Sequence, residues 1–206
     1  MKKTLTAITV SVLLSSTLGY AQDRLPTISP DNYTQEQKSA AAEFEATRKV
    51  VVFGPFEPLM HSPQFMIQAS NMGNYLRYNS AIGTTLSELA ILVIAREWSQ
   101  DLEWHIHKPI ALKAGLRPEL VDAIADGRRP TDMSDDESMI YDFLIELNHT
   151  KRVSDKTYAR VEKRFGNKGV VDLSGISGYY TLLAMVMNVG QYKIPAGGKK
   201  MVRFPE

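Results

Sequence analysis

Residues 88–107 read ELAILVIAREWSQDLEWHIH, and this stretch indicates both the fold and the chemistry of the chain. It begins with a glutamate, continues through a long apolar run and ends with Glu103 and His107. These two residues are four positions apart, so on a helix they lie on one face, one turn apart. A carboxylate beside an imidazole can move protons or bind a metal. We therefore expect two helices here and, if the protein is an enzyme, its active site.

The flanking sequence also predicts helices almost throughout. Three capping boxes are expected to open helices, at Thr34 with Gln37, Thr85 with Glu88, and Ser134 with Glu137. A final helix over residues 170–189 is apolar nearly all round, which predicts that it is buried. Only residues 50–55 leave room for a short strand. Without regular alternation of strands and helices, the chain is expected to form an all-α, single-domain helical bundle.

The two ends of the chain have different compositions from the middle. Residues 1–21 have a basic start, an apolar core and small residues before position 22, the pattern of a cleaved secretory signal. The short Lys2-Lys3 start suggests a bacterial protein exported to the periplasm. Residues 22–32 read as a flexible arm, residues 33–190 as the helical domain, and residues 191–206 as an irregular tail.

Composition excludes several classes of function. Without Lys2 and Lys3, the chain has 22 basic against 23 acidic side chains. This balance predicts no binding to nucleic acid and none to a membrane after signal cleavage. The chain has no cysteine, which excludes thiol peroxidase chemistry, disulfide exchange and thiolate metal sites. An exported protein without disulfides must be stabilised by its core or by oligomerisation.

Several short motifs, taken together, resemble the carboxymuconolactone decarboxylase family, which includes the alkylhydroperoxidase-D (AhpD) proteins. They cover most of the chain after residue 57, and their order and spacing carry the resemblance more than any one of them. The motifs are PLMHSP at 58–63, GNYLRY at 73–78, ELAIL at 88–92, EWHIH at 103–107, AGL at 114–116, VDL at 171–173 and GYY at 178–180. The resemblance implies an all-helical fold and assembly into homotrimers or homohexamers.

In the peroxidase branch of this family, a glutamate precedes a Cys-x-x-Cys-x-x-x-His helix. On this chain the glutamate corresponds to Glu88 and the histidine to His107, while the cysteine positions hold Gln100 and Glu103. The resemblance therefore does not imply thiol peroxidase activity. The Glu-Trp-x-x-His form is closer to the cysteine-free, decarboxylase-like branch. Export and the extra arm at each end depart from the family's cytoplasmic, namesake enzymes.

Three residues are candidate catalytic groups, and each has a structural alternative. Glu88 is a general acid or base, or else the end of a capping box with Thr85. His107 is its proton-transfer partner, or a core histidine bonded to Glu103. Glu103 orients the imidazole or acts itself as an acid, or else forms only a surface pair. If the group is catalytic, Glu88 and His107 should line one cavity.

Four further residues are candidates for binding substrate: His61, Trp98, Trp104 and Tyr180. For both tryptophans and for Tyr180 the alternative is packing in the core or at a subunit interface. His105 and His107 are two residues apart and point in different directions on a helix, so we expect no metal site. No bound cofactor is expected either.

Two functions remain open. The first is a cofactor-free acid/base lyase or isomerase that acts on a small organic acid or lactone, with Glu88 and His107 shuttling protons and Glu103 fixing the imidazole. The second is a non-catalytic oligomeric scaffold or small-ligand binding protein of the cell envelope. The fold alone does not choose between them, because one fold hosts many functions.

Overall fold

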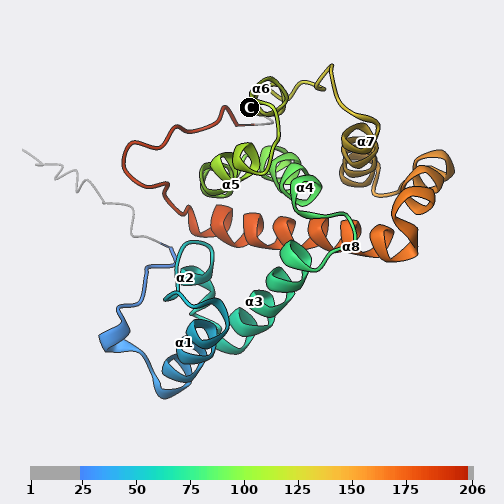
Figure 1. Ribbon diagram of the computed structural model, residues 1–206. Helices are drawn as coiled ribbons and strands as arrows, with labels where there is room; N and C mark the ends of the chain where they lie inside the picture. Colours follow the sequence, from blue (N-terminus) through green and yellow to red (C-terminus); the bar gives the residue numbers. More distant parts are fainter. Residues whose placement is uncertain (1–23, 204–206) are drawn as a thin grey trace, which may run out of the picture.

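The computed structural model describes residues 24–203, and in that range it contains helices and no strand (Figure 1). The predicted signal peptide, residues 1–21, lies outside the described residues. The all-α prediction is confirmed. In chain order the elements are η1 (Pro30–Asn32), α1 (Gln35–Arg48), α2 (Phe56–Leu59), α3 (Pro63–Tyr78), α4 (Thr84–Glu97), α5 (Asp101–Lys113), α6 (Pro118–Ala125), α7 (Asp135–Thr150) and α8 (Asp155–Gly190).

Helix α4 is the centre of the core because every residue from Ser87 to Arg96 is buried. It contacts α3, α5, α6, α7 and α8. In Figure 1, α8 crosses the middle of the molecule, with α4 and α7 on one side and α3 meeting it from the other. A helix that is apolar all round must be surrounded by other helices to be stable in water. The apolar run within residues 88–107 is thus the axis of the bundle.

Two of the three expected capping boxes are present, at Thr34 with Gln37 and at Ser134 with Glu137. The third is wrong. Helix α4 begins at Thr84 with Gly83 as its N-cap, and the Thr85 hydroxyl donates to the carbonyl of Ala114 at 2.8 Å. The Glu88 carboxylate therefore does not return to the helix start and is directed into the protein interior.

Helix α8 is broken at Gly166, whose φ of 67° and ψ of 177° are not helical. The part after this break contains the expected final helix over residues 170–189. That helix is buried along only part of its surface, since the apolar side chains of Val171, Met185 and Val189 are exposed. By length and composition α8 could cross a membrane, but half of its most apolar stretch is buried inside the bundle.

The arm and the tail meet beside the end of α8. The Thr27 hydroxyl donates to Glu57 at 3.1 Å, and the phenol of Tyr192 also donates to the Glu57 carboxylate. Further along, the tail crosses α5, where the backbone N–H of Met201 donates to Asp101 at 2.8 Å. These contacts fasten both terminal segments to the helical domain.

One close contact between α3 and α8 fixes the position of Tyr179. A Cβ atom added to Gly73 would lie 2.3 Å from the Tyr179 hydroxyl oxygen and 2.7 Å from the ring carbon that carries it. Only glycine leaves room for this phenol. Tyr179 is itself 2% exposed, so its ring has little space into which to move.

We predict that Gly73→Ala lowers the free energy of unfolding by about 1–3 kcal/mol, because overpacking displaces Tyr179. Gly178→Ala is the matched control. That glycine is exposed on α8 and a Cβ there would meet nothing within 4 Å, so alanine should raise the free energy by up to about 1 kcal/mol. Urea unfolding measures both changes. Equal effects of the two substitutions would contradict the packing argument.

Candidate functional site

The turn between α4 and α5 brings the candidate residues together. Gln100 is the N-cap of α5, and its side-chain oxygen accepts from the backbone N–H groups of Leu102 at 2.7 Å and Glu103 at 3.0 Å. Its side-chain nitrogen donates to Asn188 of α8 at 3.3 Å. Because α5 returns along α4, Glu103 and His107 come to lie beside Glu88. A residue at one of the family's cysteine positions is thus a helix cap here.

The imidazole of His107 lies between two buried carboxylates. Its Nδ1 atom is 2.7 Å from Glu88 Oε2, and its Nε2 atom is 3.3 Å from Glu103 Oε2. All three residues are at most 4% exposed. Arg77 of α3 donates to the other oxygen of Glu88 at 3.2 Å. The structure therefore brings together all three predicted catalytic residues, and neither ring nitrogen of His107 is left for a substrate.

These contacts shift two pKa values in opposite directions. Burial alone would raise the pKa of Glu88, but hydrogen bonds and charge attraction from His107 and Arg77 hold it below its ordinary value. Burial alone would lower the pKa of His107, but its bonds to Glu103 and Glu88 raise it. Both shifts favour the charged forms of Glu88 and His107, because each charge lies beside an opposite one.

A small cavity of about 40 Å³ opens beside this group. It is lined by Arg48, Phe53, Pro55, Phe56, Arg77, Glu103, Ile106, His107, Tyr179, Tyr180 and Leu183. Glu88 does not line it and lies on the other side of the imidazole, so the expectation that Glu88 and His107 share a cavity wall is wrong. Glu103 does line it, and its Oε1 atom has no hydrogen-bond partner among the described residues. Glu103 is thus the carboxylate that faces the cavity.

Of the four predicted substrate-binding residues, only Tyr180 lies at this cavity. Its ring packs edge-on against His107, with ring centroids 5.3 Å apart. Trp98 is half-buried and donates from Nε1 to Thr181 at 3.1 Å. Trp104 lines a different groove, beneath the tail. His61 is exposed, with Nε2 lying 3.0 Å from the carbonyl of Pro26, so these three lie away from the cavity beside His107.

Three of the eleven lining residues, Glu103, His107 and Tyr180, were predicted from the sequence as site residues, and eight were not. The eight are Arg48, Phe53, Pro55, Phe56, Arg77, Ile106, Tyr179 and Leu183. Arg77 belongs to the GNYLRY stretch, where its spacing of four from Gly73 places both on one face of α3. The sequence alone could therefore have indicated that Arg77 shares a helix face with Gly73. Arg48 ends α1, and Phe53 lies in the connector that follows it. No helical period links them to the site, because the folded connector brings them there.

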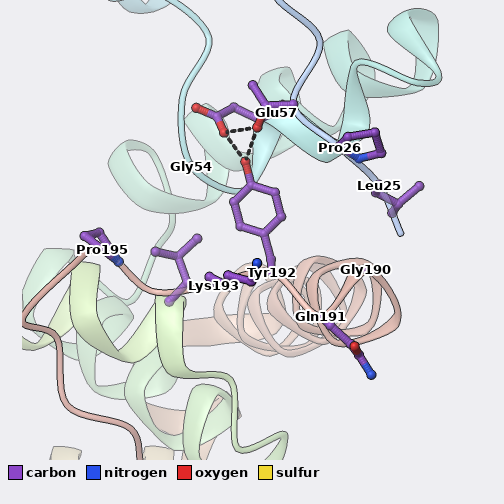
Figure 2. Close-up of a pocket in the computed structure, with 11 residues that line it drawn as sticks. Leu25, Pro26, Gly54, Glu57, Gly190, Gln191, Tyr192, Lys193 and Pro195 are labelled. Carbon is purple, nitrogen blue, oxygen red and sulfur yellow. Dashed lines mark hydrogen bonds between the residues drawn. The ribbon is translucent and has the colours of Figure 1, made fainter. Parts of the chain in front are cut away.

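Larger cavities lie elsewhere. One of about 380 Å³ is bounded by the arm, the α1–α2 connector and the start of the tail (Figure 2). In Figure 2 the Tyr192 phenol points at Glu57, and these groups bond to each other and to Thr27. No member of the Glu88–His107–Glu103 group lines it. Within residues 24–203, no cluster of three His, Asp or Glu side chains is arranged to hold a metal ion.

Comparison with known proteins places the fold. No protein-family model and no curated protein matches the chain. Among solved structures, it is similar to the alkylhydroperoxidase AhpD core of an uncharacterised peroxidase-related protein from Ralstonia eutropha JMP134. The TM-score is 0.67 at 15% identity, and the match covers 84% of this chain and 92% of the other. A peroxidase-related protein from Silicibacter sp. TM1040 gives a TM-score of 0.65 at 13% identity, covering 84% and 90%. The chain therefore has the AhpD-like fold.

Proposed function

We propose that this protein is a carboxymuconolactone decarboxylase-like lyase or isomerase of the periplasm, which acts on a small organic acid or lactone by acid/base chemistry. It needs no bound cofactor and has no thiol peroxidase activity, since Gln100 and Glu103 replace the cysteines. The supporting observation is Glu103 itself. One of its oxygens is paired with His107, the other has no hydrogen-bond partner among the described residues, and the residue lines a small cavity.

This geometry changes the roles expected from the sequence. Both nitrogens of His107 are occupied by carboxylates, so Glu103 is the group that exchanges a proton with substrate. His107 links it to Glu88 and stabilises its charge. In an isomerisation, Glu103 removes a proton from a carbon next to a carbonyl group. The electron pair of that bond becomes an enolate, and the proton returns to a different carbon.

In a decarboxylation, the bond between the carboxylate carbon and its neighbour breaks and carbon dioxide leaves. The electron pair of that bond remains on the rest of the substrate as an enolate. The enolate then takes a proton from Glu103. That proton comes from the imidazolium of His107, which becomes neutral. The positive side chains of Arg48 and Arg77 on the same wall stabilise the developing negative charge. The second candidate, a non-catalytic binding protein, uses the same cavity without these steps.

The proposal predicts that Glu103→Gln and His107→Gln each lower turnover by about 10² or more, as the loss of a general acid or base does. The measurement is NMR in deuterated water over a panel of small organic acids and lactones, which detects product and deuterium incorporation. Glu97→Gln is the control, since that carboxylate pairs with His149 at the surface. Folded variants that keep wild-type turnover would refute the assignment, and no reaction by the wild-type protein would favour the binding protein.

The triad also predicts how stability depends on pH. The pKa of Glu88 is lower in the folded protein than its ordinary value of 4.5, so the ionised carboxylate stabilises the fold. This contribution to the free energy of unfolding is complete above pH 4.5 and is lost as the pH falls through the pKa of the folded state. The pKa of His107 is higher in the folded protein than its ordinary value of 6.5, so the protonated imidazole stabilises the fold. This contribution to the free energy of unfolding is complete below pH 6.5 and is lost as the pH rises through the pKa of the folded state. Both contributions are complete only between these two values.

We therefore expect His107→Gln to cost roughly 3 kcal/mol or more near pH 5.5, because it leaves the buried Glu103 without an ion-pair partner and Glu88 with Arg77 alone. The difference from wild type should shrink toward pH 3 and toward alkaline pH. Urea unfolding across this range measures it. His149→Gln, at an exposed ion pair, should cost no more than about 1 kcal/mol. A His107→Gln difference that does not change with pH would contradict the paired-imidazolium description.

We also propose that the protein is a homo-oligomer, with the trimeric or hexameric number taken from the family resemblance. Exposed apolar side chains on α8, including Val171, support assembly. Light scattering at micromolar concentration should give a multiple of three chains. Val171→Asp should favour smaller species, whereas Val51→Asp, equally exposed in the α1–α2 connector, should not. A monomeric mass for the wild-type protein would contradict the proposal.

A further inference from the structure

The cavity beside Glu103 has one more positive charge than negative. Arg48 and Arg77 both line it. Arg77 is paired with Glu88 at 3.2 Å. Arg48 forms no ion pair within residues 24–203. Its Nε and Nη2 atoms donate to the hydroxyl and carbonyl of Ser70, at 2.8 and 2.9 Å, and its guanidinium lies over the Phe56 ring. These contacts hold the guanidinium in place without neutralising it.

The remaining titratable groups leave this charge uncompensated. Glu88 and Glu103 already have basic partners, since Arg77 and His107 pair with Glu88 and His107 pairs with Glu103. Burial raises the pKa values of the cavity-lining phenols Tyr179 and Tyr180 well above neutrality, so they are uncharged. The positive charge of Arg48 is therefore the one without an opposite charge at the cavity. A partly buried cation without a counter-ion favours binding of an anion.

Two polar atoms without hydrogen bonds add chemical detail. Among the described residues, Nε of Arg77 and Oε1 of Glu103 are buried and have no partner. The first can only donate and the second, when ionised, can only accept. Leaving such buried atoms without a hydrogen bond is unfavourable. A ligand that satisfies both must carry an acceptor and, close to it, a hydrogen-bond donor.

The size of the cavity limits the ligand. Its volume of about 40 Å³ compares with about 10–15 Å³ for one water molecule on the same measure. It therefore holds a group of only a few non-hydrogen atoms. A carboxylate with one adjacent hydroxyl fits this size, and an arginine guanidinium matches a carboxylate in shape and charge.

We propose that the cavity binds a small 2-hydroxy monocarboxylate, with its carboxylate against Arg48 and Arg77 and its hydroxyl donating to Oε1 of Glu103. This inference names the substrate class of the proposed acid/base function and rests on it for the chemistry, but binding is measurable without turnover. The 2-hydroxyl placed on Glu103 brings the adjacent C–H bond close to the same carboxylate.

Isothermal titration calorimetry of the purified protein with glycolate, acetate and glycolamide tests the inference. Glycolate carries both groups, acetate lacks the hydroxyl, and glycolamide is neutral with the same shape. Glycolate should bind at least about tenfold tighter than glycolamide, as expected for hydrogen bonds to a charged group. It should also bind more tightly than acetate. Equal affinity for glycolate and glycolamide, or no binding of glycolate, would overturn the inference.

Variants locate the binding. Arg48→Met should weaken glycolate binding at least about tenfold, whereas Arg152→Met, at an exposed arginine after α7, should leave it unchanged. Arg48→Lys keeps the charge but loses the guanidinium fork, so it should give an intermediate affinity. If Arg48→Met does not fold, Arg48→Lys still tests the inference. Wild-type affinity in both Arg48 variants would place glycolate elsewhere and overturn the inference.

The outcomes also separate this inference from the proposed function. If glycolate binds through Arg48 but no organic acid or lactone reacts, the binding inference stands and the lyase or isomerase function fails. If a neutral lactone is turned over in a Glu103-dependent manner while glycolate does not bind, the function stands and the monocarboxylate inference fails.

Discussion

The ion pairs on both sides of His107 are the constraint on which the rest of the site depends. Two carboxylates at most 1% exposed would be costly inside a helical core without a cation between them. The imidazolium meets this need for both at once, with Glu88 on Nδ1 and Glu103 on Nε2. As a consequence, both ring nitrogens of His107 have carboxylate partners, although its ring lines the cavity. Glu103 has one oxygen, Oε1, without a hydrogen-bond partner among the described residues.

Several distant segments hold this group in position. Gln100 caps α5 and also contacts Asn188, which ties the α4–α5 turn to α8. Gly73 allows the phenol of Tyr179 to pack against α3, and the neighbouring Tyr180 packs against the His107 ring. The Phe53–Pro55 connector closes the cavity from another side. The cavity is therefore made from α1, α3, α5 and α8 together, and its size follows from their packing.

The fold alone does not assign an activity. The AhpD-like neighbours are peroxidase-related by description, at 13–15% identity, and this chain has no cysteine. At the two positions where the family resemblance places cysteines, this chain has a helix-capping amide, Gln100, and a buried carboxylate, Glu103. A shared helical arrangement therefore carries different side chains at these positions.

The sequence by itself determined the all-α fold, the starts of α1 and α7 and the Glu103–His107 pair, because helical period and capping are local properties. It did not determine that Glu88 turns inward, since a Thr-x-x-Glu pattern also fits a capping box and only the start at Thr84 excluded it. Nor could it place Arg48, which no periodic pattern connects to His107. Only the tertiary structure decided which oxygen of Glu103 is free and which charges share its cavity, because both depend on contacts between helices far apart in the chain.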